Sequence, residues 1–296
     1  MLKDELKCYK DKKIIFSSEG IQVYLTKKEE VEYFKKLLES LGIKHIYILV
    51  YIRNPIDAFC SLYNQRLKYP LYNLKHSESS LLSGECNFIC NHVKTIKMWS
   101  SVFGKNNIIV KLFDRNEFYC NDLLQDFAKS INLKWQKSFK IPFKKNESLN
   151  LIGMELLTRI NQILPLVQDT TVNKLRGDII NFFYKFFLSN AEELSFRPSK
   201  KIYCYYERYF EESNEWVRKE FFPTKERLFP MKDLTNYKEN YKLKEMKPEY
   251  WDKIAEFVAD LVSSKNQTIQ DNLTQIQSLN QNIKLKEQTI QDNLTQ

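Results

Sequence analysis

The stretch KHIYILVYIRNPIDAFCSLYNQ, residues 44–65, decides the fold class. Its first half is a near-continuous run of β-branched, aromatic and aliphatic residues, which is typical of a parallel strand covered on both faces. Asn54 then supplies a helix cap and Pro55 a first-turn proline, so a helix is expected from Ile56 to about Lys68. A buried strand that leads directly into a capped helix indicates an α/β domain.

The same order of strand and helix recurs along the first half of the chain. Helices are recognised by apolar residues every three or four positions and strands by short apolar runs. The predicted elements are a strand at 12–19, a helix at 27–41, a helix at 91–103, a strand at 107–113 and a helix at 122–133. Repeated strand-then-helix order predicts an α/β fold with a three-layer parallel sheet.

Beyond about Leu149 the strand signal fades and helical patterns dominate. Helices are expected at 151–164, at 174–190 and across 205–222, and they should pack over or beside the sheet. The aromatic segment 182–187 has two interpretations, a membrane-facing patch or a buried core face, and the second is the more common for such a helix.

The C-terminal tail carries an internal repeat. TIQDNLTQ occurs at 268–275 and again at 289–296, a shift of three heptads. Two interpretations stay open: a marginal coiled coil that gains order by self-association through 265–296, or a flexible polar extension. The aliphatic residues spaced seven apart are Val262, Ile269, Ile276, Ile283 and Ile290.

Composition limits the possible partners and the compartment. The 296 residues include 46 Lys and Arg against 37 Asp and Glu, a net charge of +9 that favours a phosphate-bearing or polyanionic partner. Because the basic residues are spread along the chain, nucleic-acid binding is not expected. The sequence shows no secretory signal and no apolar run that could span a bilayer, so we expect a cytoplasmic protein without a transmembrane segment.

Cys86, Cys90 and His92 are three potential metal ligands close together in the sequence. Their spacing matches no common zinc pattern and a second ligand pair is missing. We therefore expect no metal site, and buried free thiols instead.

The end of the central strand is the strongest candidate for a binding site. The strand delivers Arg53 to the carboxyl edge of the sheet, where ligands of open α/β sheets bind. The guanidinium, the N-terminus of the following helix and the Ser61 hydroxyl together suit an anion. The alternative is that Arg53 pairs with Asp57 and that Ser61 packs inward.

These residues resemble a known family. A strand ending in Arg-x-Pro, with Ser61 eight residues after Arg53 and an aromatic residue two further on, is similar to the 3′-phosphate-binding element of sulfotransferases. Other stretches, in the expected order, resemble bacterial members that modify cell-surface saccharides, and the resemblance covers about residues 10–232. These stretches are SSE at 17–19, VKLFDRNEF at 110–118, NESLN at 146–150 and ERYFEESNEWVRKEFFPTKERLFP at 207–230.

The resemblance implies transfer of a sulfuryl group from phosphoadenosine phosphosulfate (PAPS) to a hydroxyl of a cell-surface saccharide or its precursor. Arg53 and Ser61 would hold the 3′-phosphate of this co-substrate. Glu19 is the candidate base that takes the acceptor's proton. Arg115 and Arg208 are further candidates to face the anionic nucleotide, although each also fits a surface or ion-paired arginine.

One departure from the family pattern concerns the N-terminal region. The family's first strand is followed by a Gly/Ser/Thr-rich loop with a lysine, and residues 1–13 contain no such loop. We therefore expect residues 1–232 to form a sulfotransferase-like domain without that strand and loop, and we expect its activity to be impaired. A helical connector at 233–264 and the tail at 265–296 should follow. The alternatives are another nucleotide-using transferase of surface-glycan assembly and a noncatalytic oligomerising module.

Overall fold

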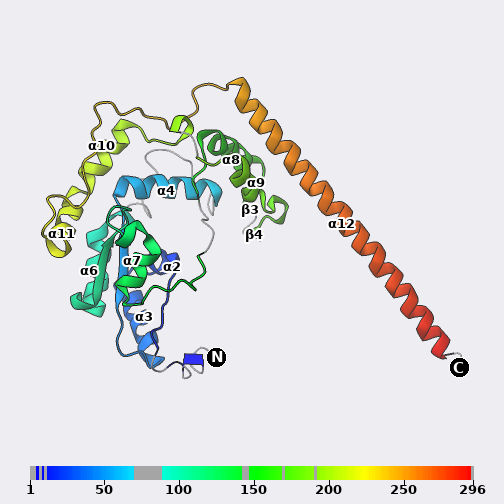
Figure 1. Ribbon diagram of the computed structural model, residues 1–296, viewed down its shortest axis with the longest axis horizontal. Coiled ribbons are helices and arrows are strands. Elements are labelled where there is room, and N and C mark those ends of the chain that lie inside the picture. Colours follow the sequence, from blue (N-terminus) through cyan, green and yellow to red (C-terminus); the bar gives the residue numbers. More distant parts are fainter. Residues whose placement is uncertain are drawn as a thin grey trace. The chain divides into compact units, whose positions relative to one another are not determined.

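The computed structural model describes residues 5–6, 9, 12–69, 89–141, 147–168, 171–189 and 192–294, and for Glu19 it describes the backbone. The chain forms two compact units. Unit 1 contains Met1–Ser148 and Phe196–Tyr241, and unit 2 contains Leu149–Ser195 and Lys242–Gln296. The elements of unit 1 are α2 (Glu19–Tyr24), α3 (Lys28–Ser40), β1 (Ile48–Ile52), α4 (Pro55–Lys68), α6 (His92–Phe103), η1 (Lys105–Asn107), β2 (Ile108–Leu112), η2 (Tyr119–Asn121), α7 (Leu123–Ser130), α10 (Lys200–Tyr209) and α11 (Glu211–Phe221) (Figure 1).

A parallel pair of strands lies at the centre of unit 1. β1 and β2 align with Val50 opposite Val110, and the Phe113 backbone N–H donates to the Ile52 carbonyl at 2.7 Å. Parallel strands need a long crossover, and the chain between these two contains α4 and α6. The α/β class with parallel pairing is thus confirmed, and the unit is mostly helical around a small two-stranded sheet.

The strand predicted at 12–19 is wrong. Residues 13–18 are irregular, and Ile14, Ile15 and Phe16 are between 38% and 50% exposed. The Ser18 hydroxyl accepts a hydrogen bond from the Gly20 N–H and caps α2, so a helix begins where the strand was expected to end. Apolar residues form a strand only where a neighbouring strand completes their backbone hydrogen bonds, which a local pattern does not reveal.

One face of the strand pair packs against α3, α6 and α11. The predicted helices at 27–41 and 91–103 are confirmed within a few residues as α3 and α6. The Trp99 ring stacks on Phe103 at 5.6 Å between ring centres, and Phe34 meets Trp99 edge-on at 6.3 Å. The buried residues of this core are Val31, Ile52, Ile96, Trp99, Phe103, Ile108, Val110, Leu112, Val217 and Leu228.

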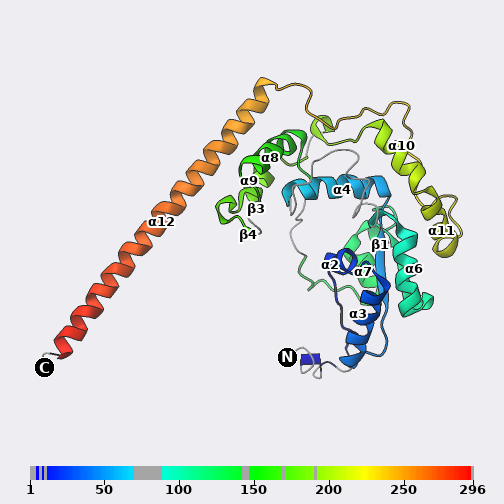
Figure 2. The same cartoon turned by 180° about the vertical axis from the view of Figure 1, so that it is seen from behind.

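The other face is joined to α7 by polar contacts, and Figure 2 shows β1 between α6 and α7. Tyr51 and Lys111 are partners across the two strands, and both reach Asp126 of α7. The Tyr51 hydroxyl donates to Asp126 at 2.6 Å, the Lys111 ammonium lies 3.2 Å away, and the Tyr119 N–H donates at 3.0 Å. Burial of Asp126 opposes its charge, but the three donors outweigh burial and lower the pKa of the carboxyl.

A second core forms between α4 and α10, and it explains a further correction. Tyr206 of α10 is buried against Phe59 of α4, with 4.9 Å between ring centres. The single helix predicted across 205–222 is instead two helices that meet at the buried Phe210. α10 packs on α4 whereas α11 packs on α6, and a straight helix could not serve both cores.

Unit 2 is built around aromatic residues of α9 and α12. Phe183 and Phe187 are fully buried and lie 5.0 and 5.3 Å from the Phe257 ring. The core interpretation of the aromatic segment is therefore confirmed for these two rings. The elements are α8 (Leu151–Ile163), β3 (Val167–Gln168), β4 (Thr171–Val172), which pairs antiparallel with β3, η3 (Lys174–Arg176), α9 (Ile179–Phe186), η4 (Glu192–Leu194) and α12 (Pro248–Leu294).

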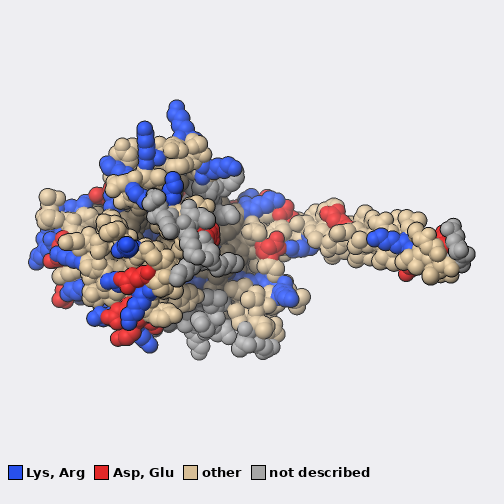
Figure 3. Space-filling model, turned by 90° about the horizontal axis from the view of Figure 1, so that it is seen from below, with Lys and Arg blue, Asp and Glu red and all other residues tan. Residues whose placement is uncertain are grey.

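α12 is a continuous helix of 47 residues. The helical connector expected at 233–264 is helix only from Pro248, because proline suits the first turn of a helix and disfavours helix in the residue before it. Every residue from Val262 to Leu294 is exposed, and the rod of α12 at the right of Figure 3 carries few charged side chains. None of the helices in the described ranges is long and apolar enough to cross a membrane.

Candidate anion-binding site at the end of β1

Arg53 directly follows the last residue of β1. Its side chain is half-buried, and the guanidinium carbon lies 5.5 Å from the centre of the Phe113 ring. Among the described residues Arg53 forms no ion pair. Desolvation raises the pKa of the nearby Asp57 carboxyl, while the charges of Arg53 and Lys232 act in the opposite direction. The guanidinium therefore acts on a nearby carboxylate without forming an ion pair with it.

The start of α4 lies beside this guanidinium. The Asn54 side-chain oxygen accepts a hydrogen bond from the Ile56 N–H at 3.3 Å, and Pro55 occupies the first turn, as the sequence predicts. Ser61 is exposed on α4, one turn beyond Asp57. In the described part of the chain no hydrogen bond joins Arg53 to Ser61. That the two groups converge on one phosphate stays a prediction.

A buried histidine contacts the backbone at the end of the strand. His92, the first residue of α6, is 4% exposed, and its Nε2 lies 2.8 Å from the Arg53 carbonyl oxygen. Because a carbonyl only accepts, Nε2 carries the proton and donates. Burial lowers the pKa of His92 to about 4, although the hydrogen bond to Arg53 acts against this change. At neutral pH His92 is therefore uncharged, and it donates a hydrogen bond to the backbone of Arg53.

A small cavity of about 70 Å³ opens beside these groups. Thr95 lines it, and the buried Thr95 hydroxyl has no hydrogen-bond partner among the described residues. Ligand pockets usually have volumes of roughly 300–1,000 Å³, so this cavity could take only a small group such as a phosphate, and the rest of a nucleotide would have to lie outside it. Its lining consists of Gln22, Val50, Tyr51, Ile52, Arg53, Ala58, Ile89, His92, Thr95 and Ile96.

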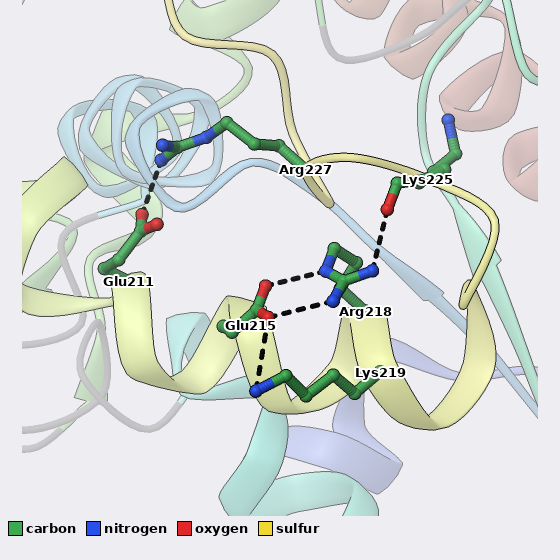
Figure 4. A network of polar contacts seen from close by, with 6 residues as sticks. All are labelled: Glu211, Glu215, Arg218, Lys219, Lys225 and Arg227. Carbon is green, nitrogen blue, oxygen red and sulfur yellow. Dashed lines mark hydrogen bonds and ion pairs between the residues drawn. The ribbon is translucent and has the colours of Figure 1, made fainter.

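A polar network joins α11 to the segment that follows it (Figure 4). Arg218 donates twice to Glu215, at 2.7 and 2.9 Å, and once to the Lys225 carbonyl at 2.7 Å. Arg227 donates to Glu211 at 2.6 Å. These contacts hold the chain after α11 in place. Farther along this segment the ring of Phe229 lies 6.1 Å from that of His92.

Lys232 follows on the same segment and adds a second cation. Its ammonium lies 5.1 Å from the Tyr237 ring centre and 5.9 Å from that of Tyr203. In the described part of the chain Lys232 forms no ion pair. Nothing in the local sequence marks it as a site residue, because it comes near Asp57 and Cys60 only through the fold. Its aromatic neighbours and its influence on Asp57 are the signals that identify it.

The neighbouring thiol and phenols are protonated at neutral pH. Burial raises the pKa of Cys60, Tyr203 and Tyr237 to about 12 in each case. Cys60 is therefore a poor nucleophile, since the thiolate is the reactive form. Two cations, uncharged aromatic rings and the N-terminus of α4 suit a phosphate group attached to an aromatic ring system.

The remaining predicted residues lie as follows. Glu19 is the first residue of α2, and its side chain lies outside the described part of the chain. Gln22 of the same helix lines the cavity together with Arg53, so the backbone of α2 approaches the end of β1. Arg115 and Arg208 are exposed, and neither forms an ion pair with a described residue.

Two of the three potential metal ligands, Cys90 and His92, make other contacts. Cys86 lies outside the described residues. The Cys90 thiol lies 3.6 Å from the Pro55 carbonyl oxygen, and His92 binds the Arg53 carbonyl. Within the described ranges, no three side chains of His, Cys, Asp or Glu gather in a way that could hold a metal ion.

Comparison with known proteins gives little guidance. No family model and no solved structure matches the chain. An uncharacterized protein of Archaeoglobus fulgidus is 22% identical over 190 residues, which are 64% of this chain. The chain spans 50% of that relative's length. The likeness assigns neither a family nor an activity, so function has to be inferred from the geometry of the site.

Proposed function

We propose that unit 1 is a sulfotransferase-like domain that binds PAPS, with Arg53 and Ser61 on the 3′-phosphate of the nucleotide. The observation that carries the proposal is the half-buried guanidinium at the carboxyl end of β1, which forms no ion pair with a described residue and directly precedes a capped helix. A second cation, Lys232, also lacks an ion pair among the described residues, and it acts on the same Asp57 carboxyl as Arg53. An arginine at such a strand end suits a pair of phosphate oxygens. Tyr237, which is partly exposed, offers aromatic surface for the base.

The full reaction extends this proposal. The sulfuryl group would pass to a hydroxyl of a cell-surface saccharide or its precursor in the cytoplasm, with Glu19 as the base. The sheet would then belong to a three-layer arrangement of the sulfotransferase kind. Transfer also requires groups that hold the 5′-phosphosulfate, so nucleotide binding is the part of the proposal to test first.

The test is calorimetric titration of the whole chain with adenosine 3′,5′-bisphosphate and with adenosine 5′-monophosphate. The wild type should prefer the bisphosphate, because the second nucleotide lacks the 3′-phosphate. Arg53→Ala should weaken bisphosphate binding by about 10- to 100-fold, the value of one charge-assisted contact, and leave monophosphate binding nearly unchanged. Arg159→Ala, which removes the same charge from an exposed site in unit 2, is the matched control.

The difference between the two nucleotides separates a specific phosphate contact from general attraction. If Arg53→Ala weakens both nucleotides equally, Arg53 does not read the 3′-phosphate. Absence of bisphosphate binding by the wild type at millimolar concentration would remove the proposal altogether. Binding of a nucleoside diphosphate sugar in its place would favour a transferase of surface-glycan assembly.

A further inference from the structure

The distal part of α12 presents an aliphatic stripe that no described residue covers. Residues seven apart share one face of the helix, and each of these side chains is at least half exposed. Val258, Leu273, Leu279 and Leu294 extend the stripe and are 47–76% exposed. The five residues of the central row, with their exposed fractions, are Val262 (52%), Ile269 (52%), Ile276 (53%), Ile283 (52%) and Ile290 (60%).

The helix itself needs a partner to be stable. Residues 266–294 contain no alanine and are rich in Asn, Gln and Thr, of which Asn and Thr favour helix only weakly. The proximal end of α12 is joined to the rest of unit 2 by two ion pairs, Lys185 with Asp260 and Lys265 with Asp178, the second at 2.7 Å. Beyond Lys265 the helix is exposed on all sides. Isolated helices of such composition are marginal in water, so packing of the stripe has to supply the stability.

From these observations we infer that the stripe of α12 binds the same stripe of a second copy of this chain. At about 1.5 Å per residue, Val258 to Leu294 extends for roughly 55 Å, and a face about 12 Å wide offers roughly 650 Å² per helix. Two such faces give roughly 1,300 Å², which lies within the size range of stable interfaces. A seven-residue repeat of aliphatic side chains is the pattern by which helices pair with helices.

Charge favours a second copy over a lipid surface. Residues 265–294 contain three lysines and three acidic residues, so two copies would repel each other little. A helix that lies on a membrane usually carries a polar face rich in Lys and Arg, whereas Asn, Gln and Thr dominate the polar face of α12. The exact repeat of TIQDNLTQ, three heptads apart, places identical side chains at equivalent positions of the stripe.

Two matched double variants of the full chain test this inference. Ile276→Lys with Ile283→Lys puts two charges on the stripe. Gln281→Lys with Gln288→Lys adds the same charges with the same spacing on a face turned away from it. At about 50 µM, sedimentation should give the wild type and the glutamine variant at least twice the chain mass of 35.5 kDa. The isoleucine variant should sediment at 35.5 kDa and lose helical circular dichroism.

Each contrary result overturns the inference. If the wild type sediments at 35.5 kDa at this concentration, the stripe does not bind a second copy of the chain and would have a different partner. An isoleucine variant that keeps the assembled mass would place the interface elsewhere, and loss of assembly in both variants would show an effect of charge rather than of the stripe. Nucleotide binding by unit 1 is independent of this interface and should be equal in all three proteins.

Discussion

Acidification should destabilise the protein through His92, and the size of the effect follows from its burial. The pKa of His92 is about 4 in the folded chain against 6.5 for a free histidine. Between these values the unfolded chain binds more protons, so stability is complete above about pH 6.5 and falls as the pH drops towards 4. From about pH 8 to about pH 5 the loss amounts to about 2 kcal/mol.

The variant His92→Gln isolates this contribution, because glutamine can still donate to the Arg53 carbonyl but does not ionise in this range. Its stability at pH 8 should fall by about 1–2 kcal/mol through altered packing, and its further loss down to pH 5 should be smaller than that of the wild type by about 2 kcal/mol. Urea unfolding followed by tryptophan fluorescence measures both quantities. The exposed His45, replaced by Gln, is the control and should keep the loss seen in the wild type.

Equal pH dependence in the wild type and in His92→Gln would show that His92 is not buried in its neutral form. It would also mean that the hydrogen bond from His92 does not hold the Arg53 carbonyl at the candidate site. A smaller dependence in the His45 variant would indicate instead that exposed groups dominate acid unfolding.

Two further changes test the packing of each unit. Asp126→Asn removes the charge from a carboxylate that three donors surround, and it should cost about 2–3 kcal/mol in urea unfolding, whereas Glu226→Gln, at an exposed position, should cost less than about 0.5 kcal/mol. Because its folded pKa is lowered, the contribution of Asp126 is present above about pH 4 and is lost below it, so Asp126→Asn should flatten the stability curve only in that acidic window. Gly153→Ala would place a methyl group 2.6 Å from the β-carbon of Phe187, and thermal melting should show unit 2 destabilised by about 1–3 kcal/mol; an unchanged melting temperature would contradict the close packing.

Local patterns predicted most of unit 1 well. The helix after Asn54 is confirmed because its cap, its first-turn proline and its buried face all lie within one short stretch. The strand at 108–112 is confirmed for the same kind of reason, since a buried strand is a compact apolar run. The prediction failed where secondary structure depends on residues that are distant in the sequence. Residues 13–18 have the composition of a strand, but no neighbouring strand pairs with them in the described chain.

The candidate site shows the same division between local and distant information. Arg53 could be found in the sequence, because the strand and the cap that position it are its immediate neighbours. Lys232 could not be found, since its place depends on how the chain after α11 is held by the contacts of Arg218 and Arg227. These contacts join residues on α11 to a segment without periodic structure.

The ion pairs around α11 therefore affect the site although none of them touches a ligand. The Arg218 side chain is 16% exposed and bonds at once to Glu215 and to the Lys225 carbonyl, so it restrains the backbone of the segment that carries Phe229 and Lys232. Phe229 in turn covers His92, and His92 supports the carbonyl of Arg53. Because this chain of contacts links the segment to Arg53, loosening the segment would move Lys232 away from Asp57 while leaving the strand pair intact.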